Sequence, residues 1–288
     1  MTVSVIILSY NTKLLLKQCL TSLRDRLDFT TGKLEIIVVD NASRDGSVAL
    51  VKQNFPQVKI ISLPQNLGFA AGNNRGLAVA TGDYVLLLNS DTQITDPQLI
   101  TVLLRYLQAH PKVALVTPKV LLPDGSLDLA CHRGLPTPWN ALTYFSGLAK
   151  VLPKCRLLAG YHQTYQNLNV IHPIAATAAT AVLVRRQAID AVGQLDERFF
   201  LYGEDLDWCK RLTDAGWQIV YHPQVSILHH KSASGKRQAD DQDTQRQSVA
   251  HFYLTMKLFY EKHYRDTYPR WLRRLVYLGI DLKQRWHR

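Results

Sequence analysis

Three carboxylates lie close together at Glu204, Asp205 and Asp207. Acidic residues favour the start of a helix because they offset its dipole, and that role explains one of the three. Their neighbours are aromatic or apolar, among them Phe200 and Trp208, so we expect a half-buried segment in which at least one carboxyl pKa rises. A carboxylate in such a place suits general base catalysis.

Two adjacent histidines, His229 and His230, follow the apolar run 225–228. A lone histidine is more often a structural residue than a metal ligand. Asp91, however, follows another apolar run and offers a hard oxygen ligand. An oxygen-rich site completed by one imidazole suits manganese or magnesium that bridges phosphates.

Three short apolar runs, at 3–8, 34–39 and 84–88, each end in a polar cluster. The runs lack polar alternation, which is typical of parallel strands buried on both faces. Because the carboxyl ends of such strands share one edge of the sheet, the clusters should form one site there. A single cluster would be explained as a turn or a helix cap, but three at equivalent positions favour a ligand site. The clusters are Ser9-Tyr10-Asn11, Asp40-Asn41-Ala42-Ser43 and Asn89-Ser90-Asp91-Thr92.

The segments between these runs are helical in character, with one weaker strand at 58–63. Asp96 is a plausible N-cap, with Pro97 at the first helical position. Alternation of strands and helices predicts an α/β fold with a mostly parallel, doubly wound sheet and helices on both faces. The expected helices are 13–27, 46–54, 68–80 and 97–109.

The pattern weakens after Pro118, where 134–149 should be loop and short helix. Order returns with a strand at 175–184 and a helix at 205–215 that Gly216 would end. Two further short strands are expected, at 218–221 and 225–228.

The composition indicates a globular protein, because 47% of the 288 residues are hydrophobic and 20% are charged. The four cysteines lie far apart without a C-x-x-C pair, which favours a reducing, cytoplasmic compartment. The N-terminus does not resemble a signal peptide. The longest apolar stretch, 174–184, is shorter than the ~20 residues that a membrane span needs.

The charge is uneven, since 34 basic and 23 acidic residues give a net charge of +11. The segment 264–288 interleaves arginines with aromatic and aliphatic residues. Two interpretations stay open: an amphipathic helix on an anionic membrane surface, or a helix packed on the catalytic domain. The charge favours the membrane slightly.

Several classes of protein lack support. Neither a Walker lysine motif nor G-x-G-x-x-G follows the first strand, which argues against a P-loop NTPase and a dinucleotide dehydrogenase. A sugar-phosphate nucleotidyltransferase would need a glycine-rich basic loop there, and residues 9–13 do not form one. A non-catalytic nucleotide-sugar-binding protein stays an alternative. Nucleic-acid binding would rest on charge alone.

Six motifs in order and spacing resemble glycosyltransferase family 2, with the rhamnosyltransferase-like subgroup most similar. The resemblance runs from about Val3 to Ser234 and implies a GT-A catalytic domain, a nucleotide-sugar donor, a divalent metal and inversion at the anomeric carbon. The motifs are VSVIILSYN, VVDNASRDGS, NLGFAAGNNRG, LLLNSDT, LDERFFLYGEDLDWCKRLTDAGW and the segment from His229 to Ser234.

The resemblance also implies roles for single residues. Asp40 would bind a pyrimidine base, and Asp91 would be the remaining acid of a D-x-D metal element whose first position is Asn89. Asp205 of the Glu204-Asp205 pair matches the catalytic base. His229 matches a histidine that reaches the metal or the diphosphate, whereas His230 is a neighbour. The other residues expected to bind the nucleotide sugar are Ser9, Tyr10, Asn11, Asn66, Gly68, Asn73 and Ser90.

The resemblance therefore predicts an inverting, metal-dependent transferase in cell-surface polysaccharide synthesis. It would move a sugar from a dTDP- or UDP-sugar to a saccharide or lipid-linked acceptor. Residues 175–180 depart from the family's Gly-Ala or Gly-Ser step, so rhamnose is only one choice of sugar. We expect a catalytic domain at 1–235, with a nucleotide half to 118 and an acceptor half from 119, followed by a helical extension at 236–288. The enzyme would be cytoplasmic, with contact to the inner face of the membrane through that extension.

Overall fold

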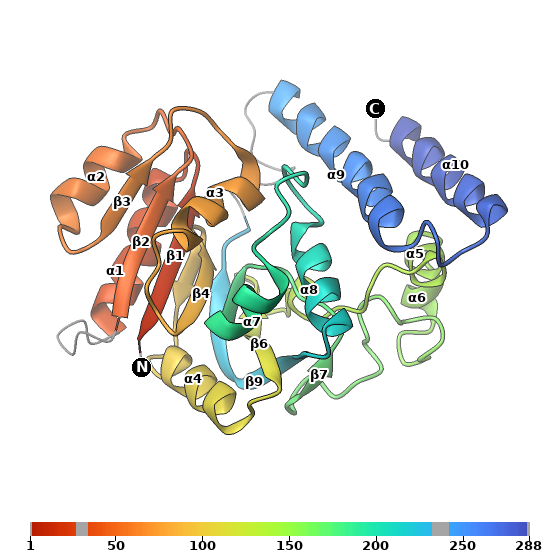
Figure 1. The fold of residues 1–288 in the computed structure, drawn as a ribbon, viewed down its shortest axis with the longest axis horizontal. Helices are drawn as coiled ribbons and strands as arrows, with labels where there is room; N and C mark the ends of the chain where they lie inside the picture. The colour runs from red at the N-terminus through yellow and green to blue at the C-terminus, as the bar shows by residue number, and fades with distance from the viewer. Residues whose placement is uncertain (1, 27–33, 232–241, 287–288) are drawn as a thin grey trace.

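The computed structural model describes residues 2–26, 34–231 and 242–286. Its strands form one mixed sheet in the order β3-β2-β1-β4-β8-β6-β9-β5, and β7 pairs with β9 (Figure 1). The strands are β1 (Val3–Ser9), β2 (Leu34–Asp40), β3 (Lys59–Ser62), β4 (Tyr84–Asn89), β5 (Thr92–Ile94), β6 (Val113–Leu121), β7 (His172–Ile174), β8 (Ala181–Arg185) and β9 (Gln218–His229). The helices are α1 (Lys13–Arg26), α2 (Ser47–Asn54), α3 (Gly68–Leu77), α4 (Leu99–Ala109), α5 (Pro138–Phe145), α6 (Leu148–Val151), α7 (Arg186–Val192), α8 (Glu204–Asp214), α9 (Gln242–His263) and α10 (Arg270–Trp286), with a 3-10 turn, η1, at Leu129–Cys131.

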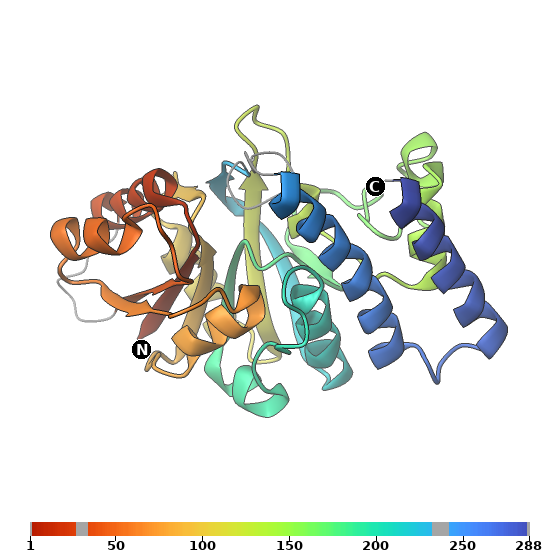
Figure 2. The same ribbon diagram turned by 90° about the horizontal axis from the view of Figure 1, so that it is seen from above.

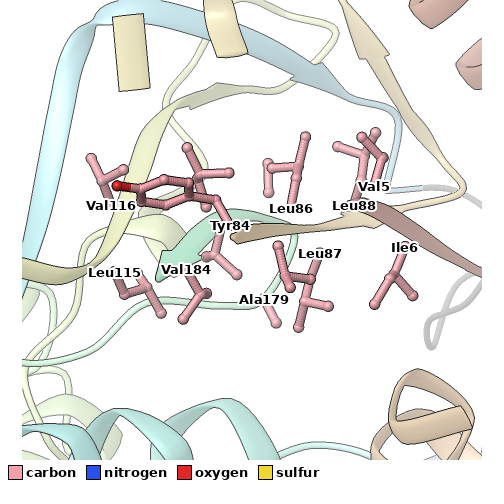
Figure 3. Packing of buried hydrophobic residues seen from close by; sticks show 14 of the residues in the cluster. Val5, Ile6, Tyr84, Leu86, Leu87, Leu88, Leu115, Val116, Ala179 and Val184 are labelled. Carbon is pink, nitrogen blue, oxygen red and sulfur yellow. The ribbon is translucent and has the colours of Figure 1, made fainter. Parts of the chain in front are cut away.

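The first four strands run parallel, as the sequence predicts. β1 lies between β2 and β4, so Val5 is level with Ile36 and Leu86. Successive side chains along β4 alternate between the two faces of the sheet: Leu86 points to one face and Leu87 to the other (Figure 3). All four of these side chains are buried, which explains why the strands lack polar alternation.

Helices cover both faces of this parallel part. The connections through α1 and α2 run in one direction along the sheet and the connection through α3 runs back, so right-handed crossovers put α3 opposite the other two (Figure 2). Gly72 and Gly76 let α3 approach β1 closely. A Cβ at Gly72 would lie 2.4 Å from Leu8 Cδ1, and one at Gly76 would lie 2.5 Å from Ile6 Cγ2.

The second half of the sheet is mixed. β8 pairs antiparallel with β4 and with β6, whereas β6 and β9 are parallel. The α/β prediction is therefore confirmed, with four parallel strands, β3, β2, β1 and β4, at one end of the sheet.

Several predicted elements were wrong in extent. The strand expected at 175–184 begins only at Ala181, because residues 175–180 form a turn-rich connection from β7. The strands expected at 218–221 and 225–228 are one strand, β9, and register shifts in its pairing with β6 carry it past Pro223. Helix α4 begins at Leu99, and Asp96 Oδ1 instead accepts a hydrogen bond from Gln98 N at 2.8 Å.

Helices α9 and α10 form an antiparallel hairpin at one end of the molecule (Figure 1). α9 is fastened to α8 through Asp207, which is completely buried and lies 2.6 Å from Lys262 Nζ and 2.7 Å from His263 Nε2. An ion pair of 2.6 Å between Lys257 and Asp281 joins α10 to α9.

α10 packs against α9 on one side, whereas Leu278 and Leu282 on another side are exposed. No helix in the described ranges is both long and apolar enough to cross a bilayer. Residues 232–234, which end the sixth family-like motif, lie outside the described part of the chain.

Candidate active site

The predicted polar clusters meet at one edge of the sheet. Ser9 and Asp40 are level in the β1–β2 pair, and Asn89 is level with Leu8 in the β1–β4 pair. Hydroxyl groups connect two of the clusters: Thr12 Oγ1 lies 2.9 Å from Ser9 Oγ and donates to Ser90 Oγ at 3.0 Å. The parallel register thus brings together residues that lie up to 81 positions apart in the chain.

Asp40 presents one free oxygen at this edge. Its Oδ2 accepts a hydrogen bond from Ser43 N at 3.0 Å. Its Oδ1 is buried and has no hydrogen-bond partner within the described ranges. A buried acceptor without a donor costs free energy, so this oxygen is suited to a ligand N–H group.

The loop after β1 is held against the loop after β2. Asn11 has a positive φ of 53°, its N–H donates to Ser43 Oγ at 2.9 Å, and its Oδ1 accepts from Arg44 N at 2.8 Å. Tyr10 beside it is exposed, with 43% of its surface accessible, so its ring is available for contact with a ligand.

Asn41, which carries no assigned role above, organises the loop that holds Asn66 and Gly68. Its Nδ2 donates to Asn66 Oδ1 at 2.8 Å, and its Oδ1 accepts from Leu67 N at 2.8 Å. Gly68 has a φ of +84°, and a Cβ there would lie 2.3 Å from Phe200 O. The glycine therefore permits close contact between this loop and the chain that leads to α8.

Asn73 lies one turn into α3 and is buried. Its Nδ2 donates to Phe69 O at 2.9 Å within the same helix. That bond accounts for one of its polar groups, and its expected contact with the nucleotide stays a prediction.

His229 lies between two carboxylates. Its Nε2 is 3.3 Å from Asp91 Oδ1, and its Nδ1 is 3.0 Å from Asp128 Oδ2. Burial alone would lower the pKa of His229, but the two carboxylates raise it to about 9. The ring is therefore positively charged at neutral pH and donates from both nitrogens. His230 is placed differently: its backbone N–H donates to Asp91 O at 2.9 Å.

Within this cluster, only Asp91 offers a free oxygen that could bind a metal ion. Asp91 Oδ2 is buried and has no hydrogen-bond partner in the described chain, which leaves one hard oxygen ligand free. Among the described residues no group of three or more His, Cys, Asp or Glu side chains could hold a metal by itself. Asn89, at the end of β4, adds no charge. A metal at Asp91 would need further oxygen ligands, such as the phosphates of a donor.

Asp205 lies at the start of α8, and Arg133 was not predicted as its partner. The Arg133 Nη2 group donates to Asp205 Oδ2, and both side chains are almost buried, at 12% and 13% exposed. Asp205 Oδ1 accepts from Leu206 N at 2.7 Å. Burial disfavours the charge on Arg133, yet Asp205 raises the pKa of the guanidinium overall. Asp205 thus has one hydrogen bond at each oxygen and keeps lone pairs for another donor.

Glu204 differs from its neighbours. Burial, followed by the nearby charge of Asp205, raises its pKa well above the usual value, and its Oε2 has no hydrogen-bond partner in the described structure. Burial would also raise the pKa of Asp207, but hydrogen bonds from His263 and Lys262 lower it. The three carboxylates therefore differ: the pKa of Glu204 is raised, Asp205 keeps free lone pairs, and Asp207 is held by Arg211 and Lys262.

Two side-chain contacts in the site were not predicted from the sequence. Asp128 reaches His229 across 101 positions and also pairs with Lys231 Nζ at 3.0 Å, while Arg133 reaches Asp205 across 72 positions. Both come from 121–168, where strand and helix periodicity is weak. The spacing of residues carries no signal for such side-chain pairs.

A mixed sheet whose parallel strands end in polar groups, and a carboxylate at a helix start beyond that edge, agree with the GT-A fold. The model of glycosyl transferase family 2 matches residues 4–190. The chain belongs to that family, and it resembles the rhamnosyltransferase-like subgroup.

Relatives agree with this assignment. The chain is 30% identical over 219 residues to an N-acetylglucosaminyl-diphospho-decaprenol L-rhamnosyltransferase of Mycobacterium tuberculosis, covering 72% of this chain and 70% of that protein. It is 28% identical over 207 residues to the O-antigen biosynthesis protein RfbC of Myxococcus xanthus, of which it covers 15%. The enzyme is thus a glycosyltransferase, with relatives named for rhamnosyl transfer and for O-antigen biosynthesis.

Solved structures share the fold. TarS of S. aureus aligns with a TM-score of 0.57 at 18% identity, over 90% of this chain. This chain spans 64% of that TarS chain. The mannosyltransferase PcManGT of Pyrobaculum calidifontis, in complex with GDP-Man and Mn2+, aligns with a TM-score of 0.60 at 17% identity, over 98% of this chain and 69% of that one.

Proposed function

We propose that the protein is an inverting transferase that moves a hexosyl group from a pyrimidine nucleoside-diphosphate sugar to a hydroxyl of a lipid-linked saccharide. One observation carries the proposal: two buried carboxylate oxygens, Asp40 Oδ1 and Asp91 Oδ2, lack partners among the described residues near the same edge of the sheet. One is suited to the N–H of a base and the other to a cation at a diphosphate.

The donor is a dTDP- or UDP-sugar in this proposal. Asp40 Oδ1 accepts the N3–H of the pyrimidine, and Tyr10 contacts the ring. Asn11, Asn66 and Gly68 shape the loops around the nucleoside. The remaining expected contacts are Ser9, Asn73, Asn89 and Ser90.

Asp91 and His229 handle the diphosphate. A divalent manganese or magnesium ion, when bound at Asp91 Oδ2, supplies positive charge beside the leaving group. His229 is a cation at neutral pH and places positive charge beside the diphosphate. Asp128 fixes the ring by accepting from Nδ1.

Asp205 acts as the base in a single displacement. The acceptor hydroxyl donates to Asp205, loses its proton there and attacks the anomeric carbon from the face opposite the diphosphate, which inverts the configuration. Arg133 fixes the orientation of the carboxylate. The raised pKa of Glu204 disfavours a second negative charge beside the base.

The acceptor assignment rests on the relatives. The mycobacterial relative is named for a diphospho-decaprenol acceptor, and we extend a polyprenyl-diphosphate-linked saccharide to this chain. Rhamnose, the sugar in that name, is the first donor sugar to test. We assign residues 1–235 to the catalytic domain, with halves at 1–118 and 119–235, and residues 236–288 to a helical extension. Contact with the inner face of the cell membrane through α10 is part of the same proposal.

A donor screen tests the function. Purified protein is incubated with dTDP-rhamnose, UDP-sugars and GDP-mannose, with and without manganese, and with a polyprenyl-diphosphate-linked saccharide. We expect release of a pyrimidine nucleoside diphosphate that depends on the acceptor, and an inverted anomeric configuration of the product by NMR. A retained configuration, or transfer from the purine donor alone, would contradict the proposal.

A further inference from the structure

A cavity of about 470 Å³ lies between α5, the start of α8 and the α9–α10 hairpin. Its size is in the usual range for small-molecule sites. Its walls are mostly apolar, and their side chains come from three different helices. Six of them are Leu142, Phe145, Met256, Phe259, Val276 and Ile280.

One end of the cavity is polar and belongs to the active site. Asp205, Glu204 and Arg133 line it. Arg133 Nε is buried and has no hydrogen-bond partner among the described residues, so this guanidinium keeps a donor for a ligand. Lys283 also lines the cavity and brings a second positive charge. The site therefore combines an apolar body with a cationic, catalytic end.

The surface of α10 beside the cavity is also apolar. Trp271, Leu275, Leu278 and Leu282 recur every three or four positions, and each is more than half exposed. This spacing puts them on one stripe of the helix, next to the cavity-lining stripe that includes Val276.

Other exposed residues complete the setting. Across the cavity, α5 and α6 expose further large apolar side chains, at Trp139, Leu142, Leu148 and Val151. The exposed arginines Arg270, Arg274 and Arg285 flank the apolar stripe of α10 on its other side. Apolar surface bordered by cations suits an amphiphile whose chain comes from an anionic membrane.

We propose that this cavity binds the polyprenyl chain of the acceptor next to its diphosphate, so that α5, α9 and α10 form a lipid-chain site. The diphosphate lies near Arg133 and Lys283, and the acceptor sugar reaches Asp205. This inference rests on the proposed function, because it takes the lipid-linked acceptor as given. The continuity of the apolar cavity with the catalytic carboxylate favours a single ligand with both chemistries.

Gly279 offers a direct way to fill the site. It lines the cavity from α10, and a Cβ built there meets no atom within 4 Å in the described structure. Gly279→Phe therefore adds a ring that projects into the cavity without a clash at its root. Gly279→Ala is the control, because it also removes the glycine from the helix and adds only one methyl group. Ala141→Phe fills the cavity from α5 and serves as the second variant.

The test is a binding measurement that needs no turnover. Farnesyl diphosphate is titrated into wild type, Gly279→Ala, Gly279→Phe and Ala141→Phe by calorimetry, with inorganic diphosphate as the chain-free probe. We expect the two phenylalanine variants to bind farnesyl diphosphate roughly tenfold or more weakly, since a ring displaces the equivalent of about two buried methylene groups. The alanine control, and the affinity of all four proteins for UDP or dTDP, should match wild type.

Two results would overturn the lipid-chain site. One is equal affinity for farnesyl diphosphate in all four proteins. The other is full competition of farnesyl diphosphate by UDP or dTDP, which would move the probe to the donor site. The proposed function fails separately: a wild type that binds farnesyl diphosphate in the cavity but transfers no sugar keeps the site and loses the function.

Discussion

Among the three clustered carboxylates, neutralising Asp207 should lower the free energy of unfolding the most. It is completely buried, and Arg211, Lys262 and His263 all pair with it, at 2.6 to 2.9 Å. In Asp207→Asn, Arg211 loses this carboxylate partner and Lys262 keeps only Asp196, while the shape of the side chain is kept. Breaking a buried ion pair typically costs about 3–5 kcal/mol. We expect about 3 kcal/mol, because Lys262 and Arg211 remain about one-fifth exposed and can turn toward water.

Asp214→Asn is a matched control in the same helix. Asp214 also pairs with a cation at spacing i, i+4, but it is 57% exposed, so its loss should cost at most about 1 kcal/mol. Urea denaturation followed by circular dichroism measures both variants. The pKa of Asp207 is lowered in the folded protein, so its contribution is present above the unfolded pKa and is lost as the pH falls through the folded one. Equal losses for the two variants at pH 7 would refute the reasoning.

Three further outcomes are expected. The pKa of Glu204 is raised in the folded protein, so its contribution to stability is present below the unfolded pKa of 4.5 and is lost as the pH rises. Glu204→Gln should therefore become more stable relative to wild type with increasing pH. A constant difference in urea midpoint between the two proteins from pH 5 to 8 would contradict this. Asp91→Ala should abolish the manganese enhancement of nucleoside-diphosphate binding in calorimetry, and His229→Ala should weaken it less; unchanged enhancement in Asp91→Ala would put the ion elsewhere. Leu278→Asp should reduce sedimentation with anionic liposomes and leave the protein unbound to neutral ones, as expected for an exposed apolar residue at a membrane surface; binding equal to wild type would exclude α10 as the contact.

The sequence predicted that the polar clusters meet at one edge of the sheet, because parallel pairing follows from the strands themselves. Apolar runs buried on both faces must stack in register, so Ser9, Asp40 and Asn89 had to end at the same edge. The glycines at 72 and 76 agree with the same logic, since they let α3 lie on β1. The contacts that Asp128 and Arg133 make do not follow from strand pairing.

Arg133 and Asp128 could not be placed from the sequence. Each reaches its partner from a segment whose path is set by turns and short helices rather than by a periodic pattern. The sequence also does not show how Glu204, Asp205 and Asp207 differ. The difference depends on contacts with α9, because Lys262 pairs with Asp207, whereas burial raises the pKa of Glu204. Local spacing predicted the cluster of carboxylates, and tertiary packing determines the environment of each one.

The rate of glycosyl transfer by Asp205→Asn tests the central claim most directly. Transfer is measured at saturating donor and acceptor, and nucleoside-diphosphate affinity is measured by calorimetry on the same preparation. The amide cannot take the proton of the acceptor hydroxyl, so we expect transfer to fall by about 10²–10⁴-fold with donor affinity unchanged. Transfer at the wild-type rate would contradict the assignment of Asp205 as the base and the mechanism built on it.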